Sequence, residues 1–162
     1  MIEISLQSGE PFCPPSRDAV PDMTHASKFR EQLDAASRPC LSICIVDDDR
    51  TASFLLGRLL EKLGQKVHIC AKADAAIDLV RKFRVDILIS DVSMPGISGY
   101  DLARMLREEF GSECPFLVAL TGFGRKQDRD QALASGFDEH VVKPIGIEQI
   151  LEVINCASSR TA

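Results

Sequence analysis

The stretch from Asp86 to Gly99, D-I-L-I-S-D-V-S-M-P-G-I-S-G, decides the fold. Its apolar run, Ile87 to Ile89, is short and rich in β-branched residues, which is typical of a strand buried on both faces. The run leads to one carboxylate, Asp91, and Met94 to Gly96 then break the strand before a helical pattern begins at Gly99. Asp91 is therefore expected where a buried strand meets a loop, at the rim of a parallel sheet where ligands bind.

Apolar runs and helical patterns alternate on both sides of this stretch. Strands are predicted at 41–46, 66–70, 87–90, 116–120 and 139–142. Five helices are predicted between and after them, and their marker residues are Leu56, Leu60 and Leu63; Ala76, Val80 and Phe83; Leu102, Met105 and Leu106; the polar segment 125–135; and Ile147, Ile150, Leu151 and Ile154. The alternation predicts an α/β fold: a doubly wound, flavodoxin-like, five-stranded parallel sheet of order 2-1-3-4-5, with helices on both faces.

The composition is that of a soluble globular protein. The chain has 162 residues, of which 45% are hydrophobic and 27% charged, and its net charge is −5. This balance argues against binding to nucleic acid or to an anionic membrane surface. There is no membrane-spanning apolar run, no signal peptide, and no C-x-x-C pair among the six cysteines, so a cytoplasmic protein with reduced cysteines is expected.

The first 38 residues differ from the rest of the chain. They contain four prolines, scattered serines and few clustered apolar residues, which is typical of a flexible extension with at most a short helix at 24–36. The regular pattern predicts one domain at 39–157 and a short C-terminal tail at 158–162. Because few residues follow the last predicted helix and the sequence begins with Met1, a stand-alone domain is expected.

Polar residues end four of the predicted strands: Asp47, Asp48 and Asp49 follow the first, Asp91 the third, Thr121 the fourth and Lys143 the fifth. Parallel strands end at the same rim, and the first and third would be neighbours about 4.8 Å apart. Two carboxylates about 4 Å apart repel by about 4 kcal/mol at an effective dielectric of 20, so a cation such as Mg²⁺ is expected between them. A carboxylate beside a metal, a lysine and a hydroxyl is suited to accept a phosphoryl group. Asp49 is instead expected to cap the following helix.

The sequence resembles the receiver domain of two-component response regulators over about residues 41–154. The motifs that carry the resemblance are I-V-D-D at 45–48, D-V-S-M-P-G-I-S-G at 91–99, A-L-T-G at 119–122 and V-V-K-P at 141–144. The resemblance implies a regulatory domain rather than an enzyme. It implies that Asp91 accepts a phosphoryl group from a sensor histidine kinase or a histidine phosphotransfer protein, and that Thr121 and Lys143 contact this group.

The same resemblance implies a metal site and two structural residues. Mg²⁺, replaceable by Mn²⁺, would be bound by Asp47, Asp48, Asp91 and the backbone carbonyl of Ser93. The peptide bond before Pro144 is expected to be cis, and Gly99 is expected to be structural.

A switch is implied between Thr121 and the position three residues before Lys143. The family usually has Tyr or Phe there, whereas this chain has His140. Two interpretations remain open, a pH-sensitive switch and a substitution that simply packs adequately. Neither Ser93 nor Phe123 can hold a water with a carboxylate or carboxamide, which predicts slow self-dephosphorylation.

Phosphorylation is expected to change one surface of the domain, and three alternative functions remain open. Phosphorylation should alter the surface of the fourth helix, the fourth and fifth strands and the fifth helix, for a protein partner, in a monomer or a phosphorylation-dependent dimer. One alternative is a receiver cut from a hybrid histidine kinase. Another is an aspartate-nucleophile phosphatase, for which 47–49 has the D-x-D spacing, and a third is a flavin or nucleotide binder, which three aspartates after the first strand disfavour.

Overall fold

The sheet has the predicted strand order. The computed structural model describes residues 39–161, and its five parallel strands lie in the order β2-β1-β3-β4-β5. The elements are β1 (Ser42–Val46), α2 (Arg50–Lys62), β2 (Lys66–Cys70), α3 (Ala73–Lys82), β3 (Ile87–Asp91), α4 (Gly99–Phe110), the 3₁₀ turn η2 (Gly111–Glu113), β4 (Phe116–Thr121), α5 (Lys126–Ala134), β5 (Glu139–Val142) and α6 (Ile147–Thr161). The doubly wound α/β prediction is confirmed, and the helix predicted at 24–36 lies outside the described residues.

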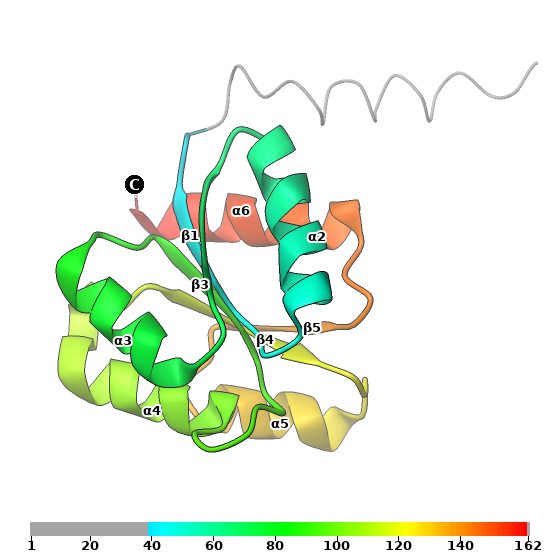
Figure 1. Cartoon of the computed structure of the whole chain (residues 1–162). Helices are drawn as coiled ribbons and strands as arrows, with labels where there is room; N and C mark the ends of the chain where they lie inside the picture. Colours follow the sequence, from blue (N-terminus) through cyan, green and yellow to red (C-terminus); the bar gives the residue numbers. More distant parts are fainter. Residues whose placement is uncertain (1–38, 162) are drawn as a thin grey trace, which may run out of the picture. The chain divides into compact units, whose positions relative to one another are not determined.

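Helices cover both faces of the sheet and create two hydrophobic cores. Helices α2 and α6 lie on one face, and α3, α4 and α5 lie on the other (Figure 1). The first core joins Leu60 of α2 and Ile154 of α6 to Ile45 of β1, and the second joins Leu102 of α4 to Leu88 of β3. Alternate residues of each strand supply the two cores because successive side chains of a strand point to opposite faces.

Strand β3 lies at the centre of the sheet, which explains its uninterrupted apolar run. It pairs with β1 through Ile43↔Ile87 and with β4 through Ile87↔Phe116. Every residue of β3 is buried, including Asp91 at its end. A strand with neighbours on both sides and helices on both faces has no solvent face, so a continuous apolar run is required.

Two of the residues that marked helices in the sequence are exposed, and both lie at the limits of a helical face. Helix α3 ends at Lys82, so Phe83 has extended backbone, is 57% exposed and stacks on His68 of β2 at 6.2 Å between ring centroids. Met105 is 41% exposed because the buried face of α4 is formed by Leu102, Ala103 and Leu106, which turns position 105 outward. Periodicity located both helices correctly, although neither of these two side chains belongs to the buried face.

The last helix is longer than predicted. Helix α6 continues to Thr161, through most of the segment predicted as a C-terminal tail. The cysteines of the described part are free thiols, and Cys44, Cys70 and Cys114 are buried as small hydrophobic residues. Within residues 39–161, no helix combines the length and apolar character needed to cross a bilayer.

Candidate functional site

Four strands deliver their last polar residues to one rim of the sheet. Asp47 directly follows β1, Asp91 ends β3, Thr121 ends β4 and Lys143 directly follows β5. Since all these strands are parallel and β1, β3, β4 and β5 are successive neighbours, their carboxyl ends meet. The structure thus brings the predicted acidic residues, hydroxyl and lysine to the same end of the sheet.

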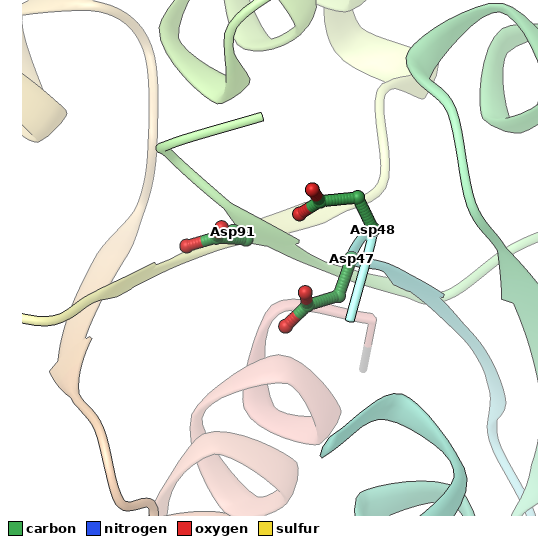
Figure 2. A group of neighbouring side chains, drawn as sticks. All are labelled: Asp47, Asp48 and Asp91. Atoms are coloured by element: carbon green, nitrogen blue, oxygen red, sulfur yellow. The ribbon is translucent and has the colours of Figure 1, made fainter. Parts of the chain in front are cut away.

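Three carboxylates converge at this rim. Asp47, Asp48 and Asp91 each offer an oxygen, and these oxygens lie within 4.8 Å of one another (Figure 2). Asp47 is 3% and Asp91 7% exposed, whereas Asp48 is exposed. Two buried carboxylates and one open to solvent form an all-oxygen donor set of the kind that a hard divalent cation with remaining water ligands prefers. The residues present therefore fit Mg²⁺.

Lys143 balances part of this negative charge. Its Nζ donates a 2.8 Å hydrogen bond to Asp47 Oδ2 and lies 3.3 Å from Asp91 Oδ1. Burial opposes the charged ammonium, but the hydrogen bond and charge of Asp47, with a smaller contribution from Asp91, outweigh it and raise the pKa of Lys143. The lysine therefore stays charged and joins the two buried carboxylates.

The three consecutive aspartates after β1 have different roles. Asp47 Oδ1 accepts a 2.9 Å hydrogen bond from the backbone N–H of Asp49, which fixes the turn. Asp49 Oδ1 accepts from the N–H groups of Thr51 and Ala52 at 2.9 and 3.1 Å, which makes it the N-cap of α2. The predicted capping role of Asp49 is confirmed. Among the three aspartates, Asp48 is exposed and its carboxylate accepts no backbone N–H in this turn.

Thr121 has a hydrogen bond that was not predicted. Its Oγ1 donates to the carbonyl oxygen of Phe123 at 2.8 Å and lies 2.8 Å from Nε2 of His140. Thr121 is 3% exposed and His140 is half-buried on β5. The polar character of position 140 was the only signal in the sequence that could have suggested this contact.

The remaining predicted residues surround the rim. Ser93 is exposed two positions after Asp91, and the Lys143–Pro144 peptide bond is cis. Gly99 begins α4, and its N–H donates to the carbonyl oxygen of Val92 at 3.2 Å. A Cβ at Gly99 would overlap the carbonyl oxygen of Asp91, so a glycine lets α4 start directly against the end of β3.

A cluster of hydrogen bonds around Asp138 lies at the opposite end of the sheet, and no sequence pattern predicts it. The carboxylate of Asp138 accepts hydrogen bonds from Arg107 at 2.6 Å, from the backbone N–H of Leu117 at 2.7 Å and from Arg160 at 3.0 Å. The partners are 21 to 31 residues away in sequence, which no local pattern reveals. Asp138 ties α4, β4 and α6 together before β5 begins.

Comparison with known proteins agrees with this geometry. The family model of the response regulator receiver domain matches residues 43–155. The chain is 34% identical over 167 aligned positions to the virulence sensor protein BvgS of Bordetella pertussis, and the match covers 100% of this chain but only 12% of BvgS. The chain thus spans about an eighth of that relative's length. It belongs to the response regulator receiver domain family, a family of signalling domains.

Solved structures share the fold. A response regulator receiver domain protein from Clostridium thermocellum superposes with a TM-score of 0.68 at 25% identity, covering 75% of this chain and 96% of that chain. The receiver domain of Ssk1 from Saccharomyces cerevisiae, crystallised with the histidine phosphotransfer signaling protein Ypd1, gives a TM-score of 0.70 at 21% identity, covering 77% and 93%. Both matches confirm the three-layer architecture.

Proposed function

We propose that the chain is a phosphorylation-dependent switch of a phosphorelay, with Asp91 as the phosphoryl acceptor. A carboxylate oxygen of Asp91 attacks the phosphorus of a phosphohistidine that is protonated on its other ring nitrogen. The P–N bond breaks, its electron pair stays on the ring, and the donor leaves as neutral imidazole that keeps that proton. The observation that carries this proposal is the convergence of Asp91, Asp47, Asp48 and Lys143 at one rim. Receiver domains pair with histidine kinases or phosphotransfer proteins, so we propose a donor of that class here.

The side chains around Asp91 have separate roles in this transfer. Asp47, Asp48, Asp91 and the carbonyl of Ser93 would hold Mg²⁺, which supplies positive charge next to the transferred group. Mn²⁺ has the same preference for oxygen ligands and would substitute. Lys143, already 3.3 Å from Asp91 Oδ1, stabilises the developing charge on the phosphoryl oxygens, and Thr121 donates its hydroxyl to one of them.

We propose that phosphorylation changes the surface formed by α5, β4, β5 and α6. Phosphorylation replaces the single negative charge of the Asp91 carboxylate with about −1.5 to −2 and places three acceptor oxygens there. When Thr121 turns toward those oxygens, the loop that joins β4 to α5 follows, because Thr121 is the last residue of β4 and directly precedes that loop. A downstream protein would bind this altered surface, with the domain as a monomer or a phosphorylation-dependent dimer.

The phosphorylated state is proposed to be long-lived. Ser93 and Phe123 flank the rim without a carboxylate or carboxamide, which supports slow self-hydrolysis. We place the receiver at about 39–157, after an extension at 1–38, in a cytoplasmic protein that is either separate or part of a hybrid kinase.

Intact mass after incubation with acetyl phosphate tests the function. Wild type should gain one phosphoryl group only when Mg²⁺ is present, and Asp91→Asn should gain none. Asp48→Asn should lose most of the phosphoryl gain at low Mg²⁺ concentration, because a metal ligand is removed. Asp49→Asn is the matched control and should keep the gain, since Asp49 caps α2. A gain that survives Asp91→Asn but disappears in Asp47→Asn would move the nucleophile to the first strand and favour a phosphatase. No gain by folded wild type would refute the proposal.

A further inference from the structure

The hydroxyl of Thr121 is held in place by two partners. Its oxygen lies 2.8 Å from the carbonyl oxygen of Phe123 and 2.8 Å from Nε2 of His140. With 3% of Thr121 exposed, solvent offers little replacement for either partner. The position of this oxygen therefore depends on both contacts.

Counting protons fixes the direction of the second hydrogen bond. A hydroxyl has one proton, and the Phe123 carbonyl can only accept, so the proton of Thr121 is committed to it. Thr121 Oγ1 must then accept from His140, which requires a proton on Nε2. Both the neutral Nε2–H tautomer and the imidazolium meet this requirement.

The strands hold the two side chains on one face of the sheet. Ala119 pairs with His140 and Thr121 with Val142, so His140 lies diagonally beside Thr121 on neighbouring strands. A phenylalanine here could fill the same space but could not donate to Thr121.

We infer that His140 is a positioning residue that holds Thr121 in its resting position by donating Nε2–H to the threonine hydroxyl oxygen. This inference rests on the proposed function, because the resting position matters only if Thr121 later turns to a phosphoryl group at Asp91. It assigns position 140 a hydrogen-bonding role in place of packing alone.

The hydrogen bond to His140 opposes activation. To reach a phosphoryl oxygen, Thr121 Oγ1 must leave both Phe123 and His140, and the contact with His140 has no counterpart when position 140 carries an apolar ring. One neutral hydrogen bond corresponds to about a 2- to 10-fold change in an equilibrium. We therefore expect His140→Phe to accelerate phosphorylation by acetyl phosphate about 2- to 10-fold.

Two further variants separate the hydrogen bond from ring size. His140→Gln places an amide N–H near the former Nε2 and should restore the slow wild-type rate. His68→Phe is the matched control, because His68 lies on β2 and stacks on Phe83, away from Thr121, and it should leave the rate unchanged. Equal rates in folded wild type and His140→Phe, or a Gln variant as fast as Phe, would overturn the inference.

Nitrogen-15 NMR of the full chain tests the hydrogen bond without phosphorylation. In its neutral form, His140 should show a protonated Nε2 and an unprotonated Nδ1. Thr121→Val should shift the Nε2 resonance, because the acceptor is lost. A bare Nε2 in wild type would overturn the inference even if Asp91 is phosphorylated normally. Failure of Asp91 to accept a phosphoryl group would instead refute the proposed function and leave this spectrum to decide the hydrogen bond.

Discussion

Gly99→Ala should damage the site through the backbone of Asp91. A Cβ built on Gly99 overlaps the carbonyl oxygen of Asp91 and lies 2.8 Å from Cα of Val92 and 3.1 Å from the carbonyl carbon of Asp91. Carbon atoms in favourable contact are about 3.5–4.0 Å apart, so α4 and the end of β3 must separate by roughly 1 Å. The atoms that must move belong to backbone, and β3 is paired on both sides, so no flexible side chain can absorb the change.

The expected loss of stability follows from this rigidity. Overpacking a well-packed site typically costs about 1–3 kcal/mol, and rigid surroundings favour the upper part of that range. We expect the free energy of unfolding to fall by about 2–3 kcal/mol, with a decrease in melting temperature of roughly 5–12 °C. Because the chain has no tryptophan, urea unfolding is best followed by far-UV circular dichroism.

The effect on phosphorylation should exceed the effect on folding. A 1 Å displacement moves the Asp91 carboxylate relative to Lys143 and the other aspartates, and misplacement of that size can cost about 10²-fold in rate. The rate of labelling by acetyl phosphate at saturating Mg²⁺, corrected for the folded fraction, measures this loss directly.

Gly57→Ala is a matched control on another helix. A Cβ at Gly57 meets only side chains, the closest being Cδ1 of Ile69 at 3.1 Å, and Ile69 is 48% exposed and free to move. Alanine inside a helix gains about 0.5–1 kcal/mol over glycine, which offsets that contact. Stability and labelling should stay close to wild type. If Gly99→Ala is as stable and as rapidly phosphorylated as Gly57→Ala, the reasoning from backbone contact is wrong.

Three further predictions concern other residues. Asp138→Ala leaves the Leu117 N–H and two arginines without their carboxylate and should lower the free energy of unfolding by about 2–4 kcal/mol in urea titrations, and a loss below about 1 kcal/mol would contradict this. The pKa of Lys143 is raised above its ordinary value of 10.5 in the folded protein. The charged ammonium therefore contributes its full stabilisation of the fold below the pKa of the unfolded state, and this contribution is lost as pH rises through the pKa of the folded state. In metal-free buffer, stability should therefore fall more steeply above about pH 10.5 in wild type than in Lys143→Met, and identical pH profiles would exclude this contribution. Ser93→Asn adds a carboxamide that can position water and should shorten the phosphoryl lifetime measured by intact mass, whereas an unchanged lifetime would count against the role of Ser93.

The sequence predicted what depends on local pattern. The apolar run at 87–89, the helix cap at Asp49 and the alternation of elements each express a requirement that one segment satisfies by itself, and the structure confirms all three. The strand order then followed from topology, because parallel strands with short loops allow few arrangements. The same topology predicted that Asp47, Asp91, Thr121 and Lys143 lie at one rim, because parallel strands end at the same edge of the sheet.

What the sequence could not predict depends on side-chain direction or on distant partners. Phe83 continues the helical periodicity, but the helix stops one residue earlier, and periodicity alone does not locate an end. The hydrogen bonds of Asp138 join segments more than 20 residues apart. The contact between Thr121 and His140 needs the diagonal register of β4 and β5, which becomes known only when the two strands are placed side by side.

The charges at the rim give a physical reason for Thr121 to move in the proposed function. The resting site contains three carboxylates and one ammonium, a formal excess of two negative charges that one divalent cation would neutralise. A phosphoryl group carries nearly two negative charges and replaces the single charge of Asp91, so about one negative charge stays uncompensated. The Thr121 hydroxyl is the nearby donor that can be redirected, since Lys143 is already in contact with two carboxylates. In the proposed function, the hydrogen bond from His140 would set how much of that excess charge is needed before Thr121 moves. Position 140 would then determine how readily a phosphoryl group at Asp91 changes the surface.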